Sequence, residues 1–268
     1  MHITVDDAVY WCSLSGDGEP VVLLHGFTGT SGTWNSVVPD WLPSFRTIAI
    51  DLPGHGKTAS HPNNMEAFCN DLLNILDLWK LKKVHLVGYS LGGRTALSFA
   101  MLHPERVVSL TLESASPGLD DEDQRLGRRH RDEKLASWIK ANGIHAFVNY
   151  WEELPLFSTQ ATLPEDVQQR IRSERLSQTA EGVAQSLLTM GTGVQPSWWG
   201  NLSSLHLPVL LLAGEQDAKF IAINRAMDEH LPVSHLHIVE NAGHAIHVEQ
   251  PNIFGKIVNA FLQSNQRY

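Results

Sequence analysis

The chain has 268 residues, of which 43% are hydrophobic and 18% charged, and its formal net charge is −9. This length allows one large α/β domain with a single sizeable core. The negative charge argues against general nucleic-acid binding. No apolar run approaches the ~18 residues that a transmembrane helix requires, so no membrane insertion is expected.

The beginning of the chain and its cysteines indicate a reduced compartment. Residues 1–4 have neither the charged nor the apolar region of a secretory signal peptide. The two cysteines, Cys12 and Cys69, are too few for a disulfide framework. We therefore expect a cytoplasmic protein. Nothing in the sequence predicts an oligomeric state.

Short apolar runs alternate with helical patterns along the chain. The runs that we expect to be buried strands are residues 20–24, 46–52, 84–89, 107–112, 209–213 and 235–239. Helices are predicted over residues 64–81, 93–100 and 251–262, the last with a proline near its first turn. Apolar strands separated by helices are typical of a mostly parallel sheet that is covered on both faces. Residues 2–14 are predicted to add an antiparallel edge hairpin.

One long segment interrupts this alternation. Residues 116–199 contain no clear strand pattern and are rich in Arg, Glu, Gln and Trp. We interpret them as a helical cap, inserted between two strands and lying over the strand ends. The remaining residues, 1–115 and 200–268, would then form the α/β core.

A strand, a sharp turn and a helix are predicted around Gly-Tyr-Ser-Leu-Gly at residues 88–92. Glycines two places to each side of Ser90 permit a turn that a Cβ atom would obstruct. This turn would lift the Ser90 hydroxyl clear of the sheet and place it at a helix N-terminus, where negative charge is stabilised. Ser90 is therefore a candidate nucleophile or base.

Two later residues complete a candidate catalytic triad. Asp217 follows the run 209–213, and His244 follows the run 235–239, so each comes just after a predicted strand. His244 would accept the Ser90 proton because imidazole titrates near neutral pH. Asp217 would fix the tautomer of His244 and stabilise its charged form.

Other assignments compete with parts of this triad. Asp51 and Glu113 also follow predicted strands, and Glu113 is the closer rival because the acid could sit on the preceding strand. The Gly-Glu-Gln-Asp turn favours Asp217. His244 and His247 have the spacing of metal ligands on a helical turn, but no Glu-x-x-His pattern or cysteine cluster accompanies them. We therefore predict no metal site.

A second glycine-containing loop provides a candidate oxyanion site. Residues 25–29, His-Gly-Phe-Thr-Gly, follow the first predicted strand of the parallel sheet. The backbone N–H of Phe27 would face that of Leu91, which gives two donors for a developing oxyanion. We interpret His25 as a structural member of this loop. The turn at residues 51–56 would shape the site without taking part in the chemistry.

A cluster of basic residues lies in the predicted cap. Arg125, Arg128, Arg129 and Arg131 come directly after the acidic residues 120–123. Composition alone favours a solvated helix face, with acids in the first turn where the helix dipole stabilises them. A pocket for an anionic substrate is the alternative.

Taken together, these motifs resemble the α/β-hydrolase superfamily along nearly the whole chain. The match covers the elbow at 88–92, the loop at 25–29, the Asp-Leu-Pro-Gly-His-Gly turn, and an acid and a histidine in the expected order. The resemblance implies a parallel sheet with helices on both faces and an inserted helical cap. Fold alone does not determine a reaction.

A narrower resemblance is to MenH, the 2-succinyl-6-hydroxy-2,4-cyclohexadiene-1-carboxylate synthase family of the menaquinone pathway. The similar segments are 88–94 (GYSLGGR), 116–119 (SPGL) with the basic cluster behind it, 150–151 (YW), 155–157 (PLF), 191–197 (GTGVQPS) and 214–220 (GEQDAKF). These segments span the elbow, the cap and both late loops.

This second resemblance implies a lyase that needs no cofactor. The substrate would be 2-succinyl-5-enolpyruvyl-6-hydroxy-3-cyclohexene-1-carboxylate, a tricarboxylate that loses pyruvate after Ser90 removes a ring proton. The implied substrate-binding residues are Arg94, Arg128, Arg175, Tyr89, Trp151 and Lys219, with Arg125, Arg129 and Arg172 as competitors for the cap positions. Arginine suits this role because its planar guanidinium binds a carboxylate through two hydrogen bonds.

The same residues admit two other functions. An esterase or a carbon–carbon bond hydrolase that acts on an acidic small molecule would use the same triad and oxyanion loop. A ligand-binding member of the fold with little turnover is the third hypothesis, although the candidate triad is intact.

Overall fold

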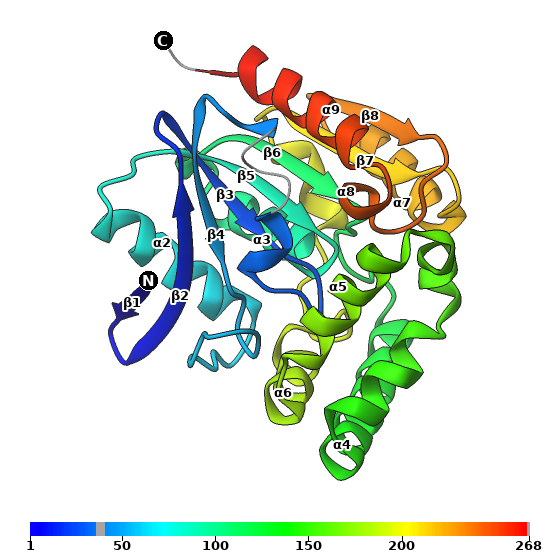
Figure 1. Cartoon of the computed structure of the whole chain (residues 1–268). Helices are drawn as coiled ribbons and strands as arrows, with labels where there is room; N and C mark the ends of the chain where they lie inside the picture. Colours follow the sequence, from blue (N-terminus) through cyan, green and yellow to red (C-terminus); the bar gives the residue numbers. More distant parts are fainter. Residues whose placement is uncertain (36–40, 267–268) are drawn as a thin grey trace.

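A single twisted sheet organises the chain in the computed structural model, which describes residues 1–35 and 41–266 (Figure 1). Over these residues the sheet has eight strands in the order β1-β2-β4-β3-β5-β6-β7-β8. The strands are β1 (His2–Val5), β2 (Ala8–Ser15), β3 (Glu19–Leu24), β4 (Phe45–Ile50), β5 (Val84–Tyr89), β6 (Val107–Glu113), β7 (Val209–Gly214) and β8 (Ser234–Val239). Pairing is parallel from β4 across to β8.

The predicted strands and the edge hairpin are all present. β1 and β2 form the antiparallel hairpin, and β2 also pairs antiparallel with β4. The strand predicted to continue to residue 52 ends at Ile50. It ends early because the Leu52 N–H leaves the sheet and donates to His25 Nε2 at 2.9 Å.

Helices cover both faces of the sheet, because successive strand residues point to opposite sides. On β3, for example, Val22 and Leu24 join one apolar cluster while Val21 and Leu23 join another. The first cluster includes residues of α2 (Met65–Leu78), α3 (Leu91–Leu102) and α7 (Ala218–His230), and the second includes residues of α9 (Pro251–Ser264). The short helix α8 (Ile246–Glu249) precedes α9. Among the described helices, none combines the length and apolar composition that a membrane crossing requires.

The segment between β6 and β7 is helical, and all of it is described. It contains α4 (Glu122–Glu152), η3 (Pro155–Thr162), α5 (Glu165–Leu176), α6 (Ala180–Met190) and η4 (Trp199–Ser204). α4, α5 and α6 lie together beside the sheet (Figure 1). Gly143 interrupts α4 with a φ of +81°, a conformation that favours glycine.

The cap helices have an apolar cluster of their own. Buried residues of α4 and α6, among them Phe147 and Leu187, form this cluster, and Phe27 of the core packs against it. The division into core (1–115 and 200–268) and cap (116–199) stays a prediction.

Close backbone packing marks the turn between β5 and α3. A Cβ atom on Gly92 would lie 2.0 Å from the carbonyl oxygen of Leu24, and one on Gly88 would lie 2.4 Å from the carbonyl oxygen of Gly92. Neither obstacle is a flexible side chain, so the backbone itself would have to move.

We predict that Gly92→Ala lowers the free energy of unfolding by about 3 kcal/mol, because overpacking forces backbone shifts of this cost. Gly127→Ala in exposed α4 is the matched control, since its Cβ would meet only Arg131 Nη1, at 3.9 Å. The control should gain about 0.5–1 kcal/mol from helix propensity. Urea unfolding followed by circular dichroism measures both, and equal changes in the two variants would contradict the prediction.

Candidate active site

Ser90 sits at a strained turn between β5 and α3. Its φ of +49° and ψ of −107° are rare for a residue with a side chain. The Ser90 N–H donates to the Glu113 carbonyl at 2.8 Å, and the Ser90 carbonyl accepts the Arg94 N–H at 2.9 Å. The turn is therefore fixed to β6 on one side and opens α3 on the other.

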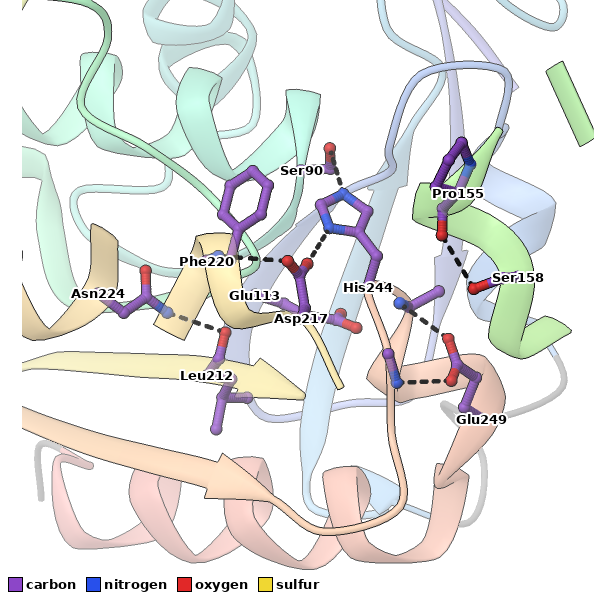
Figure 2. A network of polar contacts seen from close by, with 12 residues as sticks. Ser90, Glu113, Pro155, Ser158, Leu212, Asp217, Phe220, Asn224, His244 and Glu249 are labelled. Carbon is purple, nitrogen blue, oxygen red and sulfur yellow. Dashed lines mark hydrogen bonds and ion pairs between the residues drawn. The ribbon is translucent and has the colours of Figure 1, made fainter. Parts of the chain in front are cut away.

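Ser90, His244 and Asp217 form a hydrogen-bonded row (Figure 2). Ser90 Oγ lies 3.1 Å from His244 Nε2, and His244 Nδ1 lies 2.7 Å from Asp217 Oδ2. Because a carboxylate only accepts, Nδ1 carries the proton and Nε2 is left to accept from the serine hydroxyl. The three groups are thus arranged to move a proton from Ser90 to His244.

Local structure fixes the acid of this row. Asp217 is the N-cap residue of α7, and its Oδ1 accepts the Phe220 N–H at 3.2 Å. The side chains of Asp217 and His244 are both buried. Burial strengthens the interaction between the carboxylate and the imidazolium that forms when His244 takes a proton.

The rival acid, Glu113, has a different histidine as its partner. Both of its carboxylate oxygens lie 2.9 Å from His247 Nδ1, and Oε1 also accepts the His247 N–H at 3.0 Å. Both residues are buried. The Tyr89 ring lies next to this pair, with its centroid 4.6 Å from that of His247 and 5.5 Å from that of His244. Glu113 therefore orients His247, which packs against Tyr89, and is not part of the Ser90–His244–Asp217 row.

The turn at residues 51–56 supports the neighbouring loop. The Thr28 N–H donates to His55 Nε2 at 3.1 Å, and the Ser31 N–H donates to Asp51 Oδ1 at 2.6 Å. Burial lowers the pKa of His55 to about 3, so its ring remains neutral and can accept this hydrogen bond. These contacts agree with the predicted shaping role and account for Asp51, the third candidate acid.

The two predicted oxyanion donors border the same space. Leu91 is the first residue of α3, where a backbone N–H has no acceptor within the helix. Within the described residues, the Phe27 N–H has no hydrogen-bond acceptor. The loop approaches Tyr89 so closely that a Cβ on Gly26 would lie 2.4 Å from Tyr89 Cε1. Glycine is therefore required at residue 26.

A cavity of about 680 Å³ lies between the strand ends and the cap. Most of the predicted site residues line it: Phe27, Tyr89, Ser90, Leu91, Arg94, Arg128, Trp151, Lys219 and His244. Asp217 lies behind His244, and Arg175 is not among the lining residues. The cavity therefore combines the proton-transfer row with three cationic side chains.

Comparisons with known proteins agree with this geometry. The α/β-hydrolase fold family matches residues 19–251. A Bacillus subtilis (strain 168) protein, provisionally named as a 2-succinyl-6-hydroxy-2,4-cyclohexadiene-1-carboxylate synthase, is 49% identical over 98% of each chain. A Citrobacter koseri protein named as the same synthase is 33% identical over 87% of this chain and 90% of its own. The solved structure of MenH from S. aureus has a TM-score of 0.92 and 37% identity, covering 96% of this chain and 99% of that one. The chain belongs to the MenH family.

Membership of the MenH family, with its α/β-hydrolase fold, confirms the predicted fold class and the resemblance drawn from the sequence.

Arg94 and Arg128 both line the cavity, and the guanidinium of each is held by hydrogen bonds within the protein. Arg94 Nη1 donates to the Met190 carbonyl at 2.9 Å and to the Gln195 side-chain oxygen. Arg128 Nε donates to both oxygens of Asp132, at 2.8 and 3.0 Å. Burial, together with the neighbouring charge of Arg128, lowers the pKa of Arg94 to about 9. Arg94 therefore keeps its charge at neutral pH.

Arg175 does not line this cavity, and its predicted contact with the substrate stays a prediction. Its Nη1 lies 3.3 Å from Glu152 Oε1 and its Nη2 donates to Gln160 at 2.9 Å. The guanidinium carbon is 4.8 Å from the centroid of the Phe157 ring, and Phe157 does line the cavity. In this structure Arg175 therefore lies behind an aromatic wall.

The competing arginines separate clearly. Arg172 pairs with Glu152 and Asn149, and neither Arg125 nor Arg129 lines the main cavity. Among the cap arginines that were candidates, all of them in the described part of the chain, only Arg128 lines it.

Several residues of the site have no sequence pattern that predicts them. Ser114 lines the cavity beside Ser90, because the register pairs Tyr89 with Glu113, and it too has a left-handed φ, of +48°. Gln195 orients Arg94 from more than 100 residues away in the chain. Asp120 and Asp121 also line the cavity. No spacing rule relates these residues to the elbow.

We predict that Asp217→Asn lowers kcat by about 10⁴, because the asparagine amide can donate to His244 Nδ1 and would hold the ring in the wrong tautomer. Glu113→Gln is the matched control: it alters an equally buried carboxylate paired with the other histidine, and should cost about 1–3 kcal/mol of stability with a much smaller loss of kcat. Kinetics and urea unfolding of both variants measure this. A larger loss of kcat in Glu113→Gln would make Glu113 the functional acid.

Proposed function

We propose that this protein eliminates pyruvate from 2-succinyl-5-enolpyruvyl-6-hydroxy-3-cyclohexene-1-carboxylate to give 2-succinyl-6-hydroxy-2,4-cyclohexadiene-1-carboxylate in menaquinone biosynthesis. The observation that carries the proposal is one cavity in which the Ser90–His244–Asp217 row faces Arg94, Arg128 and Lys219. The printed names of the MenH relatives support the same reaction.

Ser90 would act as a base and not as a nucleophile that becomes acylated. As Ser90 Oγ takes the ring proton adjacent to the succinyl ketone, His244 Nε2, 3.1 Å away, takes the hydroxyl proton. The resulting imidazolium is stabilised by Asp217, 2.7 Å from Nδ1. The proton thus moves along hydrogen bonds that already exist before substrate binds.

The electrons of the broken C–H bond would first reach the ketone oxygen. The N–H groups of Phe27 and Leu91 would stabilise the enolate, a role that requires donors fixed in place beforehand. Collapse of the enolate forms a C2=C3 double bond, shifts the C3=C4 bond to C4=C5 and breaks the C5–O bond, which expels the enolate of pyruvate. This enolate takes up the proton held by the Ser90–His244 pair and becomes pyruvate, which returns both side chains to their starting state. The two products together contain every atom of the substrate, and no redox step occurs.

The cationic side chains would bind the carboxylates of the substrate. Arg94 is four residues after Ser90, about one helical turn, so it lies near the elbow. Arg128 approaches from the cap and Lys219 from the start of α7. Trp151 and Tyr89 would pack against the apolar parts of the substrate. Arg175 would support Phe157, which lines the cavity, by packing its guanidinium against the ring.

Both cysteines support the proposed cytoplasmic location. Cys12 and Cys69 are unpaired and buried. Burial raises the pKa of Cys12 to about 12, so this thiol stays protonated and unreactive under physiological conditions.

We predict stoichiometric release of pyruvate when purified enzyme is given the enolpyruvyl substrate without added cofactor. Ser90→Ala should be slower by about 10³-fold or more, because the base is lost while binding remains. A lactate dehydrogenase assay measures pyruvate directly. Intact substrate after long incubation with the wild-type protein would contradict the assignment.

The hydrolase alternative makes a different prediction for the same experiment. A hydrolase would form an acyl adduct on Ser90 and incorporate solvent oxygen into its product, whereas the elimination does neither. The reaction is run in ¹⁸O-labelled water and then quenched. Mass spectrometry of the protein and of the product distinguishes the two.

We predict that Arg94→Lys raises KM or lowers kcat by about tenfold or more, because an ammonium cannot reproduce the two parallel hydrogen bonds of a guanidinium. Arg131→Lys is the matched control, since Arg131 is exposed on α4 and does not line the cavity. Steady-state pyruvate release measures both. Equal kinetics in the two variants would show that Arg94 does not bind the substrate.

A further inference from the structure

One carboxylate of the cap binds the turn that follows the loop at residues 25–29. Glu174, near the end of α5, accepts at a single oxygen, Oε1, from the Thr30 N–H at 3.0 Å, the Thr30 hydroxyl at 2.6 Å and the Thr33 hydroxyl at 2.7 Å. The Thr30 hydroxyl also accepts the Gly32 N–H at 3.0 Å. The turn is therefore oriented by a group that belongs to the cap.

A second cap residue, Gln178, contacts the loop itself. Its Nε2 lies 3.3 Å from the carbonyl oxygens of both Thr28 and Gly29. Its Oε1 accepts the Gly56 N–H at 2.9 Å. Gln178 is only 4% exposed, so water does not compete easily for these contacts. This amide joins the loop to the 51–56 turn from the cap side.

Phe27 comes just before these contacts in the chain, and its ring packs against the cap as well as against His55, with 5.5 Å between the centroids of Phe27 and His55. The centroid of the Phe27 ring is 5.3 Å from that of Trp151 and 6.1 Å from that of Phe147. On the core side, His55 and Asp51 hold Thr28 and Ser31. The peptide that carries the Phe27 N–H is held within the loop, because the Gly26 carbonyl accepts the Gly29 N–H at 3.0 Å and lies 2.7 Å from His25 Nδ1. The residues that follow this peptide are held by the core on one side and by the cap on the other.

We propose that Glu174 and Gln178 are positioning residues that aim the Phe27 N–H at the developing oxyanion. They do not reach the substrate and act only through the backbone of the loop. The proposal rests on the proposed function in one respect, the role of that N–H as an oxyanion donor. A donor displaced by about 1 Å loses much of its effect on a transition state, so the seating of the cap determines how well the oxyanion is stabilised.

The test compares Glu174→Ala with Glu174→Gln. Alanine removes the shared acceptor, and we expect kcat to fall about tenfold while KM changes less than about threefold. Glutamine retains an oxygen that can accept the same three hydrogen bonds, so it should restore most of kcat. Glu165→Ala is the matched control, because Glu165 is an exposed acid of the same helix whose carboxylate accepts from Gln169.

A second readout does not depend on the lyase reaction. A small p-nitrophenyl phosphonate bonds to Ser90 Oγ through phosphorus, releases nitrophenolate and passes the serine proton to His244, while its phosphoryl oxygen occupies the oxyanion position. Labelling should slow in Glu174→Ala by a factor similar to the loss of kcat. If the wild-type protein releases no pyruvate, the proposed function fails, yet the labelling rates still test the positioning role.

The thermal midpoint of each variant separates positioning from folding, with all rates measured well below the lowest midpoint. A lower midpoint in Glu174→Ala, with kcat and labelling within about twofold of wild type, would overturn the proposal. So would a Glu174→Gln variant as slow as Glu174→Ala, because the same hydrogen bonds would then not be the cause.

Discussion

Contact between backbones where β5 meets α3 is the constraint on which the rest of the site depends. Gly88 and Gly92 leave no room for a Cβ atom, and Gly92 lies directly against the carbonyl of Leu24. This closeness forces Ser90 into a left-handed conformation and points α3 at the cavity. Because parallel strands end at one edge, Asp217 and His244 then meet Ser90 there, although they are far from it in the chain.

The core supplies the proposed proton-transfer row and two of the three cationic side chains of the cavity, Arg94 and Lys219, and the cap adds Arg128. The hydroxyl, imidazole and carboxylate all follow strands of the sheet, whereas Arg128 and Trp151 come from the cap. A hydrolase could use the same row of three side chains, so what favours elimination is the cationic surface opposite it. The acids Asp120 and Asp121 line part of that surface, but Asp121 caps α4 and Asp120 accepts from Ser197. Their local roles explain acidic residues beside a cavity that is proposed to bind an anionic substrate.

Much of this arrangement could be predicted from the sequence because it follows from local patterns. Apolar runs identified the strands, glycines identified the elbow, and chain order placed Asp217 and His244. The remainder depends on contacts that no spacing rule describes. Arg175 and Arg128 are equally basic in the sequence, yet Glu152 and Phe157 keep one out of the cavity while Asp132 orients the other. The sequence also allowed Glu113 as the acid of the triad, but tertiary packing pairs its carboxylate with His247. The turn-binding residue Glu174 carries no motif at all.

The separate apolar cluster of α4 and α6 has an evolutionary consequence. Since the cap buries its own hydrophobic surface, evolution could lengthen, shorten or replace it without unfolding the core that holds Ser90, Asp217 and His244. Selectivity could then diverge rapidly while the reactive groups stay ancestral. Any replacement cap would still need to support the loop at residues 25–29. Related proteins should therefore differ most at cap positions that face the cavity and least where the cap contacts that loop.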